Sequence, residues 1–167
     1  MVIGIGGSRD FRYMGWVASF VRQLPTNSSI VTGGHVSKAT GKVAPTIGVD
    51  SAAAAAGKLR GFPIKLIPPQ DEDIFKAGYP AACIMRNQII VDDCEEFYAF
   101  WDGKSKGTKN TIIRAIAAKK IRMIQYQHGP VSVYRIVAGK LMNAKFSDLE
   151  QVPPLYRAYG GRADRMI

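Results

Sequence analysis

The sequence predicts an α/β fold in which a mainly parallel, doubly wound sheet of five or more strands carries helices on both faces. Apolar runs alternate with helix-like stretches over residues 1–126, which is the pattern of strand–helix–strand units. Most of these runs are apolar throughout, as expected of strands buried on both faces. A chain of 167 residues with 47% apolar residues can also bury a core as one domain, with a small C-terminal extension.

The elements follow from the apolar runs and from the residues between them. The predicted strands are Val2–Ile5, Ser29–Val31, Pro63–Ile67, Glu96–Trp101 and Ile121–Tyr126. The predicted helices are about Phe11–Leu24, Val49–Arg60, Pro80–Asp93 and Thr108–Lys120. Asp10 is placed to cap the first helix, Gly61 to end the second and Pro80 to open the third.

The C-terminal region, residues 127–167, differs in character from residues 1–126. Two of its segments, Val131–Ala138 and Lys140–Phe146, are predicted to form a hairpin through Gly139. The last segment, Val152–Ile167, is rich in Pro, Gly, Arg and Tyr. We expect it to be either an oligomerisation arm or a disordered tail.

The chain carries 23 Lys and Arg residues against 13 Asp and Glu, a formal net charge of +10. Such a positive field attracts phosphates on a small nucleotide or on nucleic acid, although it also simply favours solubility. No apolar run suits a membrane span, and the N-terminus lacks a signal-peptide pattern, so we expect a cytoplasmic protein without a membrane partner. Cys83 and Cys94 are not spaced as metal ligands, and neither a metal nor a cofactor is expected.

Three glycine-rich loops follow predicted strands, and ligands of open α/β sheets bind at the carboxyl ends of strands. The first loop contains Gly6, Gly7, Ser8 and Arg9. Glycines let the backbone approach a ligand, the next helix offers free N–H groups to an anion, and Arg9 can make a bidentate phosphate contact. A tight turn without a ligand would also need two glycines.

The second loop contains Gly33 and Gly34, and the segment His35–Ile47 separates this pair from the next helix. A long polar segment at a ligand edge is often a lid or a specificity element. His35 has no evident acidic partner, so we expect a ligand contact in preference to a general base, with a purely structural role as the alternative.

The third loop joins the very apolar strand Glu96–Trp101 to the fourth helix. Its glycines, hydroxyls and lysines next to a helix start make a cradle for phosphate. The candidate ligand contacts in it are Asp102, Gly103, Ser105, Gly107 and Thr108. The loop is not a P-loop, because Lys109 follows Thr108 instead of preceding it. A capped loop without a ligand is the alternative.

Arg86 falls inside the apolar arc of the third helix. A buried guanidinium is costly unless it is paired, so we expect an anion near it, either a protein carboxylate or a ligand phosphate. Snorkelling of Arg86 to solvent is the alternative. Asn87 on the flank can add hydrogen bonds. Asp50, which follows Gly48 at the start of the second helix, is a candidate acceptor for a ribose hydroxyl.

These motifs, in this order, resemble the SLOG superfamily of Rossmann-like nucleotide-binding proteins. The superfamily includes the LOG phosphoribohydrolases, the DNA-processing protein DprA and sensor domains of prokaryotic defence systems. The matching segments, within about Val2–Tyr126, are Gly6–Arg9, Val31–Gly34, Gly48–Ala52, Met85–Gln88 and Gly103–Thr108. Their spacing is most similar to small stand-alone SLOG proteins of uncertain function. The resemblance implies a nucleotide or nucleotide-derived ligand and a homo-oligomer, a dimer or larger. We expect its phosphate to lie between Arg86 and the Gly103–Thr108 turn.

The sequence departs from the LOG enzymes at two places. Their PGGxGTxxE motif has a glutamate implicated in cleaving the N-glycosidic bond, and the corresponding position here is Thr111, which cannot act as a carboxylate. Related proteins also run from the second diglycine almost directly into the Gly-Val-Asp motif, whereas His35–Ile47 intervenes here. We therefore expect a sensor, carrier or sequestering protein that binds its ligand without hydrolysing it.

Two alternatives stay open. The first is a LOG-like phosphoribohydrolase acting on nucleoside 5′-monophosphates, with Asp50 or Asp102 in place of the glutamate. The second is a DprA-like single-stranded nucleic-acid binder that uses the basic, aromatic segment Tyr156–Arg162. It ranks last because the sequence contains no specific single-strand-binding module.

Overall fold

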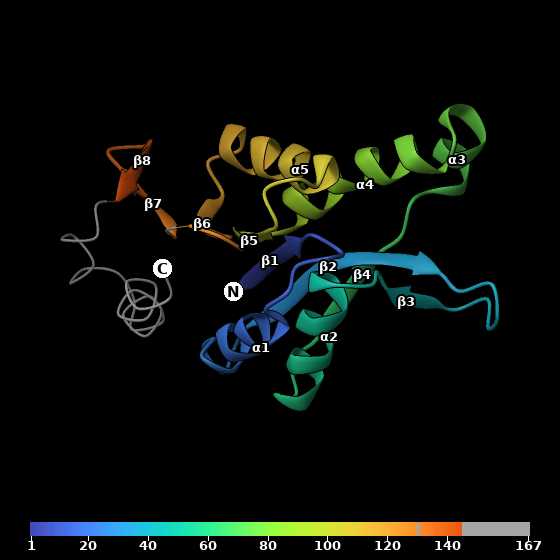
Figure 1. Ribbon diagram of the computed structural model, residues 1–167, viewed down its shortest axis with the longest axis horizontal. Coiled ribbons are helices and arrows are strands. Elements are labelled where there is room, and N and C mark those ends of the chain that lie inside the picture. The colour runs from blue at the N-terminus through green and yellow to red at the C-terminus, as the bar shows by residue number, and fades with distance from the viewer. Residues whose placement is uncertain (130, 145–167) are drawn as a thin grey trace.

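The computed structural model describes residues 1–129 and 131–144. Over this part the chain alternates strands and helices (Figure 1). The strands are β1 (Val2–Gly7), β2 (Ser29–Val36), β3 (Val43–Pro45), β4 (Ile64–Ile67), β5 (Glu96–Trp101), β6 (Ile121–Tyr126), β7 (Ser132–Val137) and β8 (Lys140–Ala144). The helices are α1 (Met14–Arg22), α2 (Val49–Leu59), α3 (Asp71–Ala77), α4 (Tyr79–Asp93) and α5 (Lys106–Ala117).

The strands form one mixed sheet, and its parallel part has the order β4-β2-β1-β5-β6. Helices α1 and α2 cover one face of the sheet, while α3, α4 and α5 lie on the other (Figure 1). The predicted Rossmann-like α/β class is therefore confirmed. Within the described residues, none of the helices combines the length and the apolar character needed to cross a membrane.

Each face of the sheet has its own apolar core. Ile3 and Ile5 of β1 pack with Phe100 of β5 under α1 and α2. On the other face, Phe97 packs with Ile90 of α4. Because both faces of β1 and β5 are covered, every position of these strands except the ends is apolar or glycine, which explains the runs without alternation.

The segment His35–Ile47 is a β-hairpin and not a free loop. Strand β2 continues to Val36 and pairs antiparallel with β3, so that His35 lies opposite Ala44. The turn closes through a hydrogen bond of 2.8 Å from the backbone N–H of Ser37 to the carbonyl of Lys42 and through Gly41 at φ 64°. Cross-strand backbone pairing, which leaves little trace in a short polar sequence, decides this conformation.

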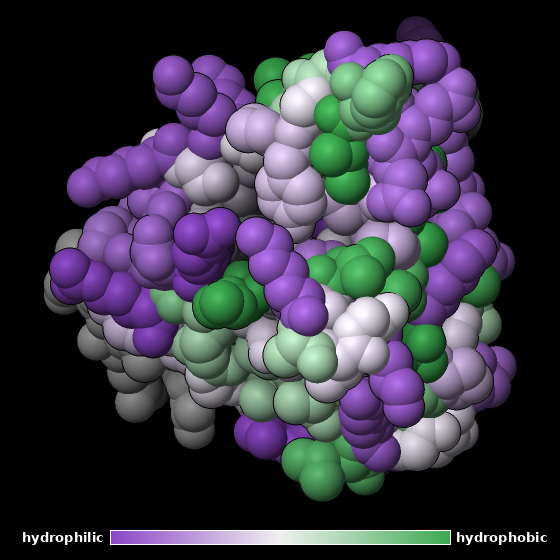
Figure 2. Space-filling model, turned by 90° about the vertical axis from the view of Figure 1, so that its right-hand side faces the viewer, coloured by the Kyte–Doolittle hydropathy of each residue, from purple (hydrophilic) through white to green (hydrophobic). Residues whose placement is uncertain are grey.

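Helix α3 was not predicted, because no residue in it is buried and no apolar periodicity marks it. Its first turn is acidic, and Lys76 in its last turn pairs with Glu72 at 2.5 Å. The helix ends at Gly78, whose φ of 81° lies in the left-handed region. Figure 2 views the molecule from the side where α3 and the β2–β3 hairpin lie, and apolar residues gather there among hydrophilic ones.

Several predicted helix boundaries are wrong by a few residues. Asp10 does not cap α1, which begins at Met14 after Tyr13 without a side-chain cap, because Phe11 is buried and the chain turns there. Helix α5 begins two residues earlier than predicted, at Lys106, because Ser105 caps it by accepting a hydrogen bond from the N–H of Thr108. The predicted roles of Gly61, at φ 71°, and of Pro80, in the first turn of α4, are confirmed.

The predicted C-terminal hairpin is confirmed over its described residues. Ala138 and Gly139, with φ of 48° and 73°, form the two-residue turn between β7 and β8. Strand β7 pairs with β6, and Val133 joins the core, so the hairpin extends the main sheet. The end of the predicted second hairpin strand and the segments Tyr156–Arg162 and Val152–Ile167 lie outside the described residues.

Candidate functional site

The loops after β1 and β5 diverge at the topological switch point of the sheet. Strands β1 and β5 are neighbours, but the chain leaves β1 toward α1 on one face and leaves β5 toward α5 on the other (Figure 1). Open α/β sheets bind ligands in the crevice that such divergent loops leave at the carboxyl ends of the strands.

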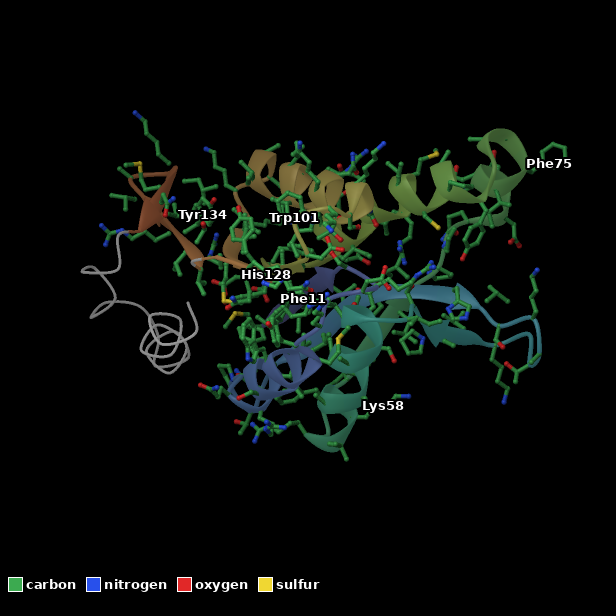
Figure 3. The ribbon with its side chains drawn as sticks, viewed as in Figure 1. Phe11, Lys58, Phe75, Trp101, His128 and Tyr134 are labelled. Atoms are coloured by element: carbon green, nitrogen blue, oxygen red, sulfur yellow. The ribbon has the colours of Figure 1, made fainter. Side chains whose placement is uncertain are left out.

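A pocket of about 670 Å³ opens at this switch point. The loop after β1 contributes Arg9, Asp10 and Arg12, and the loop after β5 contributes Asp102, Lys104 and Ser105. Gln127 and His128, which follow β6, line it as well; Figure 3 labels His128. The volume lies in the range of small-molecule sites. We call this cavity the switch-point pocket.

Backbone N–H groups of the turn after β5 stabilise the ionised form of Asp102. Its Oδ1 accepts hydrogen bonds of 2.9 and 2.8 Å from the backbone N–H groups of Lys104 and Ser105. Partial burial by itself would raise the pKa of Asp102, but the hydrogen bonds from Ser105 and Lys104 outweigh it, and the pKa lies below its ordinary value. Asp102 is therefore ionised at neutral pH.

Ser8 and Thr108 join the two loops beneath the pocket. Their hydroxyl oxygens lie 3.2 Å apart, and Ser8 Oγ also accepts a hydrogen bond of 3.1 Å from the N–H of Asp102. Both residues are buried, so these hydroxyls hold the loops together instead of facing a ligand. Thr108 Oγ1 in turn donates to Ser105 Oγ at 3.0 Å.

Most of the predicted glycines allow close packing. A Cβ at Gly7 would collide with the carbonyl oxygen of Phe100 and with Val49, and one at Gly6 would meet the Phe97 ring. Gly48 has a φ of 96° and packs against the backbone of Arg9. Two glycines differ, because a Cβ would meet nothing within 4 Å: Gly103, at φ 81°, and Gly107, in the first turn of α5.

A second polar cluster lies at the carboxyl ends of β2 and β4. Arg86 Nη1 donates to the carbonyl oxygens of Gly34 and Ile67, both at 3.2 Å, and to Thr46 Oγ1 at 3.4 Å. Gly33 lies between Arg86 and Asp50, and a Cβ there would collide with Asp50 Oδ2 and with Arg86 Nη1. A protein carboxyl group, that of Asp50, therefore lies near Arg86, which is one of the two alternatives that the sequence left open.

Asp50 titrates near neutrality. Burial raises its pKa from 3.8 to about 7, although the charge of Arg86 and the hydroxyls of Thr32 and Thr46 act in the opposite direction. The Thr32 hydroxyl, itself fully buried, faces the carboxyl group but makes no hydrogen bond of normal geometry. Arg86 Nε also has no hydrogen-bond partner in the part of the chain that the structure describes. Two buried polar atoms of the cluster therefore lack the hydrogen bonds that would offset their desolvation.

The Asp50 pKa predicts a pH dependence of stability. Between pH 4 and 7 the native state retains a proton on Asp50 that the unfolded chain releases, so stability falls as the pH rises, by up to about 1.4 kcal/mol per pH unit. We expect Asp50→Asn to remove this contribution. Urea titrations at several pH values should show a steeper decline for the wild type than for the variant; parallel curves would contradict the assignment.

Arg9 connects the cluster with the switch-point pocket. Burial and the Cys83 thiol raise the pKa of Tyr79, while the positive charges of Arg86 and Arg9 oppose this rise. Both arginines therefore lie within electrostatic reach of the Tyr79 phenol. Since Arg9 also lines the pocket, the two polar regions are adjacent along one edge of the sheet.

The structure divides the predicted site residues between these regions. Arg9, Asp102 and Ser105 line the pocket. Of the other predicted residues, Gly6 and Gly7 end β1, Ser8 and Gly103 lie in the loops after β1 and β5, Gly48 precedes α2, and Gly107 and Thr108 lie in the first turn of α5. Gly33, Gly34, Asp50 and Arg86 form the cluster. His35 belongs to neither, because the hairpin carries it away.

The predicted placement of a phosphate between Arg86 and the Gly103–Thr108 turn has no counterpart in these contacts. Arg86 points toward the ends of β2 and β4, and it is Asn87 that reaches the carbonyl oxygen of Gly107, at 3.4 Å. Adjacent positions on α4 point about 100° apart, so the two side chains serve different regions.

Four pocket residues were missed by sequence reasoning: Asp10, Arg12, Gln127 and His128, whereas Lys104 is one of the lysines of the predicted phosphate cradle. The signal was clearest for Gln127 and His128, because they directly follow the predicted strand Ile121–Tyr126 and therefore lie at the carboxyl edge. Gln127 also connects the end of β6 with the loop after β1, since its Oε1 accepts a hydrogen bond of 2.8 Å from the N–H of Arg12.

Comparison with known proteins places the chain in no family: no family model and no curated protein sequence matches it. Within the described residues, no group of three or more His, Cys, Asp and Glu side chains is arranged to hold a metal ion.

Proposed function

We propose that the protein binds a phosphorylated nucleoside or nucleotide in the switch-point pocket. The observation that carries this proposal is the convergence of Arg9, Arg12 and Lys104 on one cavity, from two neighbouring loops that lead to helices on opposite faces of the sheet. Converging cations from divergent loops create a positive potential where a phosphate can reach several donors at once.

The other pocket groups suit the rest of such a ligand. The Asp102 carboxylate can accept hydrogen bonds from ribose hydroxyls, and Ser105 sets the N-terminus of α5, with its positive dipole end, beside the cavity. The resemblance to SLOG proteins points to the same class of ligand and remains part of the proposal. Homo-oligomerisation remains a prediction.

Binding, and not hydrolysis, is the proposed activity. At the position of the LOG glutamate, the Thr111 hydroxyl is buried and donates a hydrogen bond of 3.1 Å to the carbonyl oxygen of Gly107 in its own helix. A hydroxyl engaged in this way cannot stabilise an oxocarbenium ion. A sensor, carrier or sequestering role fits this arrangement.

Isothermal titration calorimetry with AMP, GMP, CMP and UMP tests the proposal. We expect at least one of them to bind and Lys104→Ala to weaken binding about tenfold, since Lys104 is exposed and its phosphate contact is partly screened. Lys58→Ala is the matched control, because Lys58 is equally exposed but lies on α2, away from His128 (Figure 3). Absence of binding by all four nucleotides, or equal losses in both variants, would overturn the proposal.

A further inference from the structure

The lining of the switch-point pocket is made of side chains that each carry a charged or polar group. It consists of three cationic side chains, two carboxylates, a hydroxyl, an amide and an imidazole. Nucleobases bind proteins mainly through their flat, weakly polar faces, which pack against aromatic or aliphatic side chains. Among residues 1–129 and 131–144, no aliphatic side chain and no phenyl, phenol or indole ring lines this pocket.

The aromatic residues close in sequence to the pocket loops are engaged elsewhere. Phe11 is buried, with its ring centroid 5.8 Å from that of Phe100. Tyr13 stacks on Trp16 at 4.2 Å. Trp101 donates its indole N–H to the carbonyl oxygen of Ser105 at 3.1 Å. Each of these rings therefore has a partner within the protein, although Tyr13 is partly exposed, and none of them lines the pocket.

The polar groups of the pocket match a phosphorylated sugar. The cations exceed the carboxylates by one, which suits a phosphate, while ionised Asp102 needs donors such as sugar hydroxyls. Gln127 is oriented by its bond from the N–H of Arg12, and its Nε2 lies 3.3 Å from His128 Nε2, so that this wall offers further polar groups. The weakly polar face of a nucleobase in the same place would satisfy fewer of these groups than sugar hydroxyls and a phosphate do.

We infer, on the basis of the proposed function, that the pocket recognises the pentose phosphate part of its ligand and contributes little to the recognition of the base. The ligand class is therefore pentose 5-phosphates, free or carrying a base that remains outside the pocket. The four nucleoside monophosphates should bind alike, and ribose 5-phosphate should bind nearly as well as they do.

Calorimetry with ribose 5-phosphate, AMP, adenosine and inorganic phosphate tests this inference on the full chain. We expect the dissociation constants of ribose 5-phosphate and AMP to agree within tenfold, with adenosine much weaker than either. Ribose 5-phosphate should also bind at least tenfold more tightly than inorganic phosphate. If AMP bound more than 100-fold more tightly than ribose 5-phosphate, the inference would fall while the proposed function stood. If neither bound, both would fall.

The role of the sugar is tested separately with Asp102→Asn. Because removing a negative charge favours every phosphate, the informative quantity is the preference for ribose 5-phosphate over inorganic phosphate. We expect this preference to drop about tenfold, because a carboxylate accepts hydrogen bonds from hydroxyls more strongly than an amide does. Asp71→Asn, an equal change of charge at an exposed position of α3, should leave the preference unaltered. An equal preference in Asp102→Asn and the wild type would overturn recognition of the sugar by Asp102.

Discussion

Arg86→Ala is expected to lower the free energy of unfolding by about 3–5 kcal/mol at pH 8, where Asp50 is ionised, because it leaves a buried carboxylate without its compensating charge. The carbonyl oxygens of Gly34 and Ile67 lose their donor in the same step. At pH 5 Asp50 is protonated, and only the hydrogen bonds are lost. The loss of stability should therefore be smaller at pH 5 than at pH 8, as measured by urea denaturation.

A double-mutant cycle with Asp50→Asn isolates the charge interaction from the other contacts of Arg86. In the Asp50→Asn background no carboxylate remains, so Arg86→Ala should be less destabilising than in the wild type at pH 8. The coupling between the two substitutions should decrease toward pH 5. A coupling that is the same at both pH values would show that Arg86 acts only through its hydrogen bonds. If Arg86→Ala does not fold, Asp50→Asn with Arg86→Gln supplies the same comparison, because glutamine also removes the positive charge.

Gly7→Ala is the second substitution with a large expected effect, a loss of about 3 kcal/mol. Gly7 pairs with Phe100, and an added Cβ would collide with the Phe100 carbonyl oxygen and the Val49 side chain. That carbonyl accepts the N–H of Ser8 at 3.0 Å, so the collision would separate β1 from β5 at the switch point. For a chain of this length the melting temperature should fall by roughly 6–12 °C.

Gly15→Ala is the matched control for Gly7→Ala. Gly15 lies in the first turn of α1, and a Cβ there would meet nothing within 4 Å. Since alanine favours helix more than glycine does, this variant should be as stable as the wild type or up to about 1 kcal/mol more stable. Gly7→Ala with wild-type stability would contradict the close approach of β1 and β5. Both variants are compared by thermal denaturation followed by circular dichroism.

The fold class could be predicted from the sequence because it depends on local patterns. The apolar runs of β1 and β5 and the helical stretches between strands are visible in single windows of the chain. Strand β3 and helix α3 could not be predicted in the same way. Strand β3 has three residues, including Pro45, and exists through pairing with β2, while α3 buries no side chain and depends on its charges and ends.

The candidate site could be predicted only in part. The rule that ligands bind at the carboxyl ends of strands placed Arg9, Asp102 and Ser105 correctly at one edge, and the apolar setting of Arg86 predicted a nearby anion. Nothing local distinguishes a protein carboxylate from a ligand phosphate, because Asp50 and Arg86 are 36 positions apart and meet only across Gly33. The contact between Gln127 and Arg12 could not be predicted either, because it joins the ends of two strands that are far apart in the sequence.

By itself, the sequence determined that this protein is an α/β domain built on a mainly parallel sheet, whereas two of its three predicted glycine loops proved to be strand ends, with Gly6 and Gly7 in β1 and Gly33 and Gly34 in β2. Tertiary structure alone decided which of the charged side chains remain open to a ligand. Arg86 donates hydrogen bonds to two carbonyl groups and interacts electrostatically with Asp50, whereas Arg9, Arg12 and Lys104 line a cavity. The physical reason is that desolvation and pairing depend on neighbours brought together by folding, whereas periodicity and capping depend on neighbours along the chain.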